Sequence, residues 1–257
     1  KHYVKTGDYS TAAKIADLYL KSNKEPMAIQ YLLKLQGTPK FETGYAEKLV
    51  KLLFKYERYD DLENCLVSLN KNNFKPEYYY YLGVSFTYSK KYEKSIESLN
   101  SAIKNGFYAV ELFELGTENS FLIKNFDQSL KFAVKGLELY PDKSEKLIAY
   151  AGKSCFELGD YTQAEKYFMK LKNDTELKKI TDTARYNMIK KLFELKKFAE
   201  IIEKFRMIET EDIKQKLTIT LEGETFKHLF TIKGKRTGKI PNLDLQRNVL
   251  NGGYIAI

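Results

Sequence analysis

Apolar residues recur along most of the chain at the spacing of helices that bury one face. From about residue 9 to residue 210, bulky apolar side chains return every three or four positions, as Leu49, Val50 and Leu53 do. This is the period of an amphipathic helix. Lysine, glutamate and other polar residues occupy most of the positions between them. The pattern therefore predicts a series of helices that pack together, and no sheet, in this part of the chain.

A short motif repeats within the helical pattern. It consists of a turn, an aromatic residue, a small or aliphatic residue three positions later, and a bulky residue four positions further on, as in Tyr161, Ala164 and Phe168. A second apolar stripe precedes each copy, and here it contains Gly152 and Cys155. The copies begin at Glu25, Tyr59, Tyr92, Phe126, Tyr161 and Phe198, which are 33 to 37 residues apart, and the copy at Glu25 lacks the aromatic residue. A regular period of this length predicts about six helical hairpins.

The motif and its spacing resemble those of the tetratricopeptide repeat (TPR) family over residues 9–210. In that family a small residue at the eighth place of the repeat and another at the twentieth let two antiparallel helices approach closely. Gly83 and Gly152 occupy the eighth place, whereas Gly116 lies one place out of register. The resemblance implies an all-α fold, a right-handed superhelical solenoid of antiparallel helix pairs, in which the first and sixth repeats are weak terminal copies.

The helical period fades after about residue 210, which divides the chain into a helical solenoid (1–210) and a C-terminal stretch (211–257). Lys216–Leu221 alternates apolar and polar residues and Phe226–Ile232 can return as a second strand, so a short β-hairpin is expected there. Two alternatives stay open for this stretch: a cap over the last helical hairpin, or a small separate module or docking tail. The basic cluster 233–239 fits a solvated loop better than an anionic surface.

The charge balance argues against specific nucleic-acid recognition. The net charge of +9 comes from 43 lysines and arginines against 34 acidic residues, but only five of the basic residues are arginines. Base and phosphate recognition favours the planar, bidentate guanidinium group. Pentatricopeptide proteins have a similar repeat length and bind single-stranded RNA through polar residues at matched places, and this chain lacks such a series. An RNA-binding helical-repeat protein is therefore only the alternative function.

Residue types that carry catalysis are sparse in this sequence. The histidines are His2 and His228, and there is no P-loop, GxGxxG, CxxC or HExxH motif. Paired carboxylates such as 60–61 stand at helix starts, where they complement the helix dipole. Cys65 and Cys155 lie in apolar helical patterns and are expected to be small core residues that never pair. We therefore expect no enzymatic activity, no catalytic residue, no cofactor and no metal ion.

The resemblance also implies a binding groove, lined by the second, fifth, ninth and twelfth places of each first helix. At the twelfth place four phenylalanines recur, which serve either partner contact or packing between hairpins. Three glutamates of the fourth repeat share one helix face. Among the tyrosines at 78–81, Tyr79 is expected in the core and Tyr80 in the groove. The expected partner-binding residues are Phe54, Tyr80, Glu111, Glu114, Glu118, Phe121, Lys153, Phe156, Lys190 and Phe193.

The predicted function is that of a scaffold or adaptor that holds a segment of another protein in this groove, within an envelope, secretion or motility assembly. No run of about eighteen apolar residues is present, so no transmembrane segment is expected. The sequence opens with Lys1-His2-Tyr3 rather than with methionine or a leader, so the true N-terminus is expected to be missing. The compartment, cytoplasmic or periplasmic and exported, stays open, as do the partner and the oligomeric state.

Overall fold

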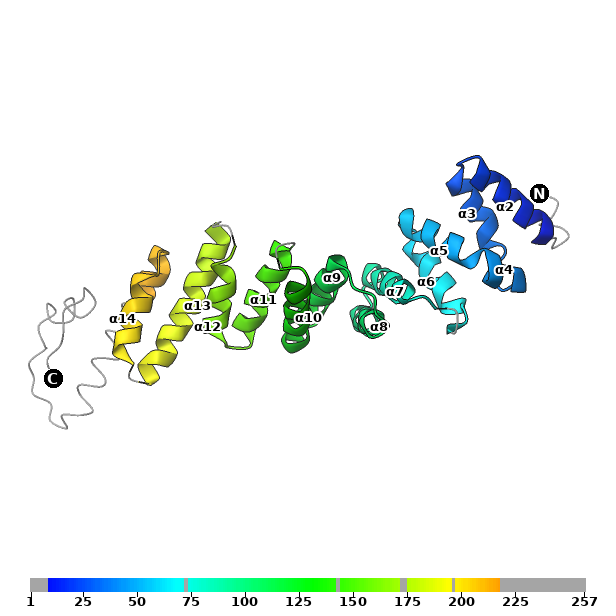
Figure 1. The fold of residues 1–257 in the computed structure, drawn as a ribbon. Coiled ribbons are helices and arrows are strands. Elements are labelled where there is room, and N and C mark those ends of the chain that lie inside the picture. The colour runs from blue at the N-terminus through cyan, green and yellow to red at the C-terminus, as the bar shows by residue number, and fades with distance from the viewer. Residues whose placement is uncertain (1–8, 72–73, 142–143, 172–174, 196, 218–257) are drawn as a thin grey trace, which may run out of the picture. The chain divides into compact units, whose positions relative to one another are not determined.

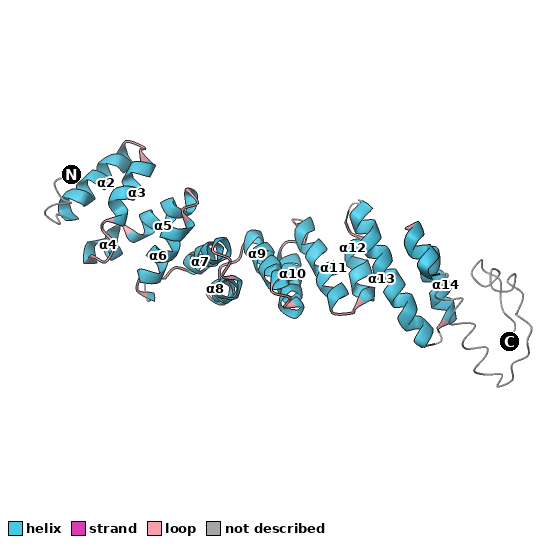
Figure 2. Ribbon diagram, turned by 180° about the vertical axis from the view of Figure 1, so that it is seen from behind, coloured by secondary structure: helices cyan, strands magenta, loops and turns pink. Residues whose placement is uncertain are grey.

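The computed structural model describes residues 9–71, 74–141, 144–171, 175–195 and 197–217 (Figure 1). Within these ranges all regular structure is helical and no strand occurs (Figure 2). The chain forms two compact units, Lys1–Lys143 (unit 1) and Ser144–Ile257 (unit 2). The predicted all-α fold of antiparallel helix pairs is confirmed for the described residues.

The described part of unit 1 contains four helical hairpins and one additional short helix. Its hairpins are α2 (Tyr9–Lys21) with α3 (Glu25–Leu33), α5 (Ala46–Lys55) with α6 (Tyr59–Ser68), α7 (Pro76–Tyr88) with α8 (Tyr92–Lys104), and α9 (Val110–Leu122) with α10 (Phe126–Leu139). The short helix α4 (Pro39–Gly44) was not predicted. Thr38 Oγ1 caps it by accepting a hydrogen bond from the Phe41 backbone N–H at 3.3 Å. Phe41 is fully buried, so α4 contributes to the core.

Unit 2 continues the same pattern with two hairpins and a further helical stretch. The helices are α11 (Glu145–Glu157), α12 (Tyr161–Phe168), α13 (Thr175–Glu194) and α14 (Phe198–Arg206), followed by helical residues 211–217. Ile208 and Leu217 are buried in one cluster with Met188, Ile189 and Leu192. The packed helical part therefore extends beyond the boundary expected near residue 210.

The first two residues of the expected β-hairpin are helical. Lys216 and Leu217 belong to the stretch 211–217, and Leu217 is fully buried against the last hairpin. Burial of this leucine outweighs the local alternation of apolar and polar residues, which is a weak signal over so few positions. The remainder of the expected hairpin and the basic cluster 233–239 lie outside the described residues.

Five hairpins, from α2–α3 to α11–α12, turn through one residue in the left-handed conformation, at the fifteenth place of the repeat. The residues, with their φ angles, are Asn23 (54°), Glu57 (53°), Lys90 (57°), Lys124 (60°) and Gly159 (77°). The N–H of the next residue bonds to the carbonyl five residues earlier, for example from Asp160 to Cys155 at 2.9 Å. This is the Schellman closure of a helix C-terminus. Because the same turn closes these five first helices, the two helices of each of these hairpins keep a constant register.

Glycines allow the helices of three hairpins to touch. A Cβ atom added to Gly83 would lie 2.7 Å from Leu99, one on Gly116 2.6 Å from the Phe132 ring, and one on Gly152 2.5 Å from the Phe168 ring. Each glycine precedes its partner by 16 residues (99 − 83, 132 − 116, 168 − 152). The shift of Gly116 by one place, predicted from the sequence, is therefore compensated by an equal shift of its bulky partner.

The two cysteines are free and buried, as expected of core residues. Burial raises the pKa of each thiol to about 11. Because the thiolate is the reactive species, we expect both thiols of the native protein to resist iodoacetamide at neutral pH and to react fully in denaturant. Intact-mass measurement counts the added groups. Modification of a native cysteine as fast as of a denatured one would contradict this packing.

Candidate partner-binding face

In each unit, the residues at the second, fifth, ninth and twelfth places of the first helices are referred to below as the first-helix face of that unit. In unit 1 these first helices are α2, α5, α7 and α9, and in unit 2 they are α11 and α13. Among the predicted residues, Glu111 and Lys190 are exposed and the others are half-buried. In unit 1 these are Phe54, Tyr80, Glu111, Glu114, Glu118 and Phe121, and in unit 2 they are Lys153, Phe156, Lys190 and Phe193.

An aromatic cluster forms around Tyr80 in unit 1. The Phe54 ring stacks on Tyr81 with centroids 4.1 Å apart and lies 6.0 Å from Tyr80. On its other side, Tyr80 stacks on Phe107 at 5.3 Å. The cluster joins α5, α7 and the segment before α9 into one half-buried aromatic surface. Tyrosine offers such a surface both a large apolar body and a polar end.

Two of the predicted glutamates lie close enough to Tyr80 to change its ionisation. Burial, and then the negative charges of Glu111 and, less strongly, Glu114, raise the pKa of Tyr80 to about 12. The hydroxyl therefore stays protonated at neutral pH and can donate a hydrogen bond. The structure thus brings an aromatic residue of α7 and acidic residues of α9 together at one place on the first-helix face.

The charges at the start of the face are paired with one another. Glu47 accepts hydrogen bonds from Lys51 at 2.8 Å and from Lys75 at 2.7 Å, and these bonds lower the pKa of Glu47 to about 2. Asp17 accepts a hydrogen bond from the Tyr45 hydroxyl at 2.7 Å. Asp17 also lies 4.0 Å from the Lys48 Nζ. In the first two repeats, side chains of the chain itself thus already bind the carboxylates of this face.

The phenylalanines at the twelfth place take part in packing. Phe121 meets Phe126 at 5.2 Å and Phe156 meets Tyr161 at 5.4 Å, both edge to face. In these two hairpins the ring therefore packs on the aromatic residue that begins the second helix. Phe54, Phe121 and Phe156 each pack on an aromatic ring and are still only half-buried.

The third hairpin has Thr87 at the twelfth place. This side chain belongs to a buried polar network that was not predicted from the sequence. The Asn119 Nδ2 donates hydrogen bonds to Thr87 Oγ1 at 2.6 Å and to Ser95 Oγ at 2.9 Å. Ser95 in turn donates to the Gly83 carbonyl at 2.8 Å. The network connects α7, α8 and α9. The only sequence signal for it is that small polar residues occupy positions of the apolar stripe.

The expected burial of the tyrosines at 78–81 is wrong by one position. Tyr78 is the buried residue, with 3% of its surface exposed. Tyr79 is half-buried and packs against Phe74 at 5.0 Å, while Phe74 also meets Tyr78 at 5.8 Å. Phe74, which precedes α7, packs on Tyr78, and Tyr78 belongs to the buried core cluster of unit 1. Tyr80, at the fifth place of the repeat, is half-buried.

Lysines lie over tyrosine rings on unit 2. The Lys153 Nζ is 5.6 Å from the centre of the Tyr150 ring, and the Lys190 Nζ is 5.8 Å from that of Tyr186. Such cation–π contacts stabilise an ammonium group without neutralising it. The first-helix face of unit 2 is thus basic and aromatic, in contrast to the acidic fourth repeat of unit 1.

A second feature that the sequence analysis missed is a buried charge network in unit 2. Arg185 donates to Glu165 at 2.8 Å and to Asp182 at 2.9 Å, and Lys204 donates to Glu165 at 2.7 Å. Asp182 also accepts hydrogen bonds from the backbone and hydroxyl of Thr210, each at 2.7 Å. These contacts hold the segment after α14 on the last hairpin and are structural.

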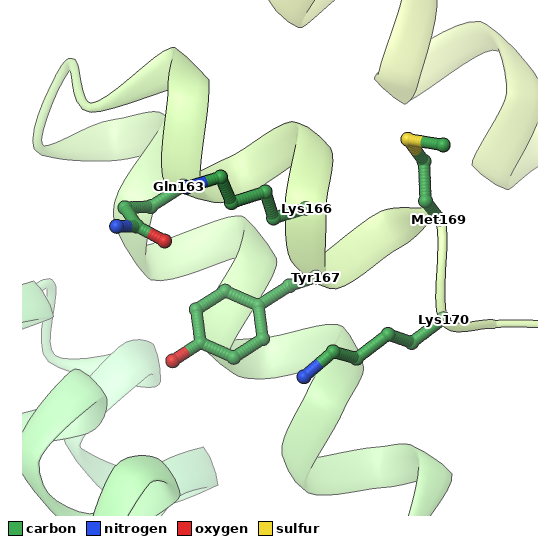
Figure 3. A pocket seen from close by; sticks show the side chains of 5 residues that line it. All are labelled: Gln163, Lys166, Tyr167, Met169 and Lys170. Carbon is green, nitrogen blue, oxygen red and sulfur yellow. The ribbon is translucent and has the colours of Figure 1, made fainter.

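A hollow of about 400 Å³ lies on unit 2. Figure 3 shows the side chains that line it. All of its lining residues come from α12 and the turn that follows, namely Gln163, Lys166, Tyr167, Met169 and Lys170. It therefore belongs to a second helix and is separate from the first-helix face. Where the structure describes the chain, no group of three or more metal-binding side chains occurs. Nor is any of the described helices long and apolar enough to cross a membrane.

Comparison with known proteins supports the fold. No protein-family model and no curated protein matches the chain. A crystal structure of the MamA protein matches it with a TM-score of 0.52 and 19% identity, over 63% of this chain and 88% of MamA. A second MamA crystal structure gives 0.50 and 20%, over 61% and 91%. The fold is a tetratricopeptide-type helical repeat.

A TPR protein from Parabacteroides merdae ATCC 43184 is also similar over 95% of this chain and 97% of its own, with a TM-score of 0.49 and 12% identity. The TPR-type fold rests on the recurring hairpin, its left-handed turn and the likeness to MamA. The resemblance predicted from the repeated motif is thereby confirmed at the level of the fold.

Proposed function

We propose that this TPR-type protein is a non-catalytic scaffold that binds a segment of another protein on its first-helix face. The observation that carries the proposal is the aromatic cluster of Phe54, Tyr80 and Phe107 beside Glu111 and Glu114. Half-buried aromatic residues bordered by charge are typical of the positions that dominate binding energy at protein interfaces.

The spacing of the face suits an extended chain. Neighbouring packed helices are about 8–10 Å apart, so an extended segment advances about three residues between them. Its side chains would meet the aromatic cluster and then the glutamates of α9. The Tyr80 hydroxyl donates a hydrogen bond and the carboxylates accept them, which suits the backbone and the polar groups of a peptide.

A photo-crosslinking amino acid at position 80 tests this proposal. We expect it to form adducts with a small number of proteins in the source cells, whereas the same amino acid at the exposed Glu97 of α8, a second helix, does not. The double change Glu111→Lys and Glu114→Lys should reduce the adducts. Gel shifts and mass spectrometry identify them. Equal adducts from both positions would contradict the proposal, and adducts with RNA would favour the alternative function.

The Phe54→Ala variant separates binding from packing. Because Phe54 is half-buried, its truncation should destabilise unit 1 by less than the roughly 3–5 kcal/mol that a fully buried phenylalanine loses. Binding of the crosslinked partner should fall at least about tenfold. Melting temperature and affinity are measured on the same variant. Full binding by Phe54→Ala, or a collapsed melt, would remove Phe54 from the binding face, and the same measurement applies to Phe121, Phe156 and Phe193.

A further inference from the structure

The two units present opposite charges on the first-helix face. In unit 2 the charged residues at its four places are Lys146, Lys153 and Lys190, and none of these places in α11 or α13 holds a carboxylate. In α9 of unit 1, the corresponding charged residues are all glutamates. A surface with one sign of charge attracts the opposite sign and disfavours its own.

Lys153 and Lys190 form no ion pair within the described residues. Lys153 lies over Tyr150, and Lys190 lies over Tyr186, whose ring also meets the Lys216 Nζ at 5.6 Å. Glu157 and Glu194 follow these lysines by one helical turn but are at none of the four places of the face. In contrast, Lys51 of unit 1 pairs with Glu47, which is on the same face.

We propose that the first-helix face of unit 2 binds an acidic protein segment, in which aspartates or glutamates stand next to apolar residues. The inference rests on the proposed scaffold function and names the chemistry of the partner at this unit. The acidic groups would pair with Lys153 and Lys190, and the apolar side chains would contact Phe156.

Two observations favour an acidic protein segment over single-stranded nucleic acid, the other polyanion. Nucleic-acid sites of this kind stack bases on open aromatic rings. Here lysine ammonium groups lie over the Tyr150 and Tyr186 rings. Arginine is the preferred side chain for phosphate recognition. Arg185, the arginine of α13, is instead buried in bonds to Glu165 and Asp182.

Fluorescence anisotropy with the full chain tests the proposal. The probes are a labelled 15-residue peptide of alternating glutamate and leucine or phenylalanine, the same peptide with lysine for glutamate, and a 15-nucleotide oligouridine. We expect the acidic peptide to bind best and the Lys153→Glu/Lys190→Glu variant to weaken it at least about tenfold, with Lys153→Gln/Lys190→Gln between the two. Binding should also weaken as salt increases.

The matched control is Lys166→Glu/Lys170→Glu on the second helix α12. It changes the net charge by the same amount, and Lys170 also lies over a tyrosine, Tyr167. We expect its affinity for the acidic peptide to stay within about twofold of the unchanged protein, because exposed charges away from a contact contribute little at moderate salt. Circular dichroism melts confirm that each variant is folded.

Three results would overturn the inference: equal weakening by the control variant, tighter binding of oligouridine than of the acidic peptide, or no binding of the acidic peptide. The scaffold proposal is tested independently by the protein adducts at position 80 of unit 1. If those adducts persist while the acidic peptide fails to bind, the inference about unit 2 is wrong and the scaffold proposal stands. If they are absent while the acidic peptide binds to unit 2 as expected, the inference about unit 2 stands and the aromatic cluster of unit 1 is not the contact that carries the scaffold function.

Discussion

The Arg185→Met variant is expected to lose about 3–5 kcal/mol of unfolding free energy, because removing one partner of a buried ion pair leaves the other charge uncompensated. Arg185 donates to Glu165, to Asp182 and, at 2.6 Å, to the Met207 carbonyl. Asp182 is fully buried, so water cannot replace the lost donor. Urea denaturation followed by circular dichroism measures the loss.

The exposed pair of Lys197 and Glu200, 3.0 Å apart, provides the control. Both side chains are about half exposed, so Lys197→Met should cost less than about 1 kcal/mol. If Arg185→Met is no worse than this control, the buried network contributes little to stability, and the segment after α14 must be held by its apolar contacts alone.

The same network gives the stability of unit 2 a dependence on pH. Burial by itself would raise the pKa of Glu165, but the hydrogen bonds from Lys204 and Arg185 outweigh burial and hold the pKa below the ordinary value of 4.5. A carboxyl group with a depressed pKa stabilises the fold above its unfolded pKa and loses that contribution as the pH falls through its folded pKa. Stability curves of Glu165→Gln should therefore be flatter below pH 4.5 than those of the unchanged protein.

The Gly152→Ala variant is expected to lose about 1–3 kcal/mol, the usual cost of placing an extra methyl group in a packed interior. Its Cβ would lie 2.5 Å from the ring of Phe168, which is itself only 3% exposed and has little room to move. Adding Phe168→Leu should recover part of the loss, because the smaller side chain leaves space for the new methyl group. A double-mutant cycle measured by urea denaturation gives the coupling.

Gly44→Ala is the control for this substitution. No atom lies within 4 Å of the position of its Cβ, and its φ is not positive. In a helix, alanine in place of glycine is neutral or stabilising by up to about 1 kcal/mol. Equal effects at Gly44 and Gly152 would mean that α11 and α12 do not need the close approach seen in the structure.

Much of the fold could be predicted from the sequence because its determinants are local and repeated. The apolar period marks the helices, and the aromatic residue after each turn marks the start of the second helix in Tyr59, Tyr92, Phe126 and Tyr161. A glycine, which adopts positive φ easily, occupies the turn at Gly159. Lys90 and Lys124 stand at the same place of their repeats and have the same left-handed conformation. The place of Tyr80 on the first-helix face follows from the same register.

Other features depend on contacts between distant residues, and only the tertiary structure decided them. Lys204 and Glu165 are 39 residues apart in sequence, and Asn119 and Thr87 are 32 apart. A pattern of single residues cannot show which polar groups meet inside the protein. Leu217 is likewise buried in one cluster with Met188 and Ile189. It is helical, although the alternation of apolar and polar residues predicted a strand there.

The candidate site likewise has properties that the sequence predicts and properties that only the structure shows. The repeat period assigns ten side chains to the first-helix places of the two units, since residues at equal places of a repeat point in equal directions. The period does not show which of them pack on a ring, as Phe121 does on Phe126, or which lie over a tyrosine without an ion pair in the described part, as Lys153 and Lys190 do. The repeat thus predicts the direction of a side chain, and the packing around it decides which groups it contacts.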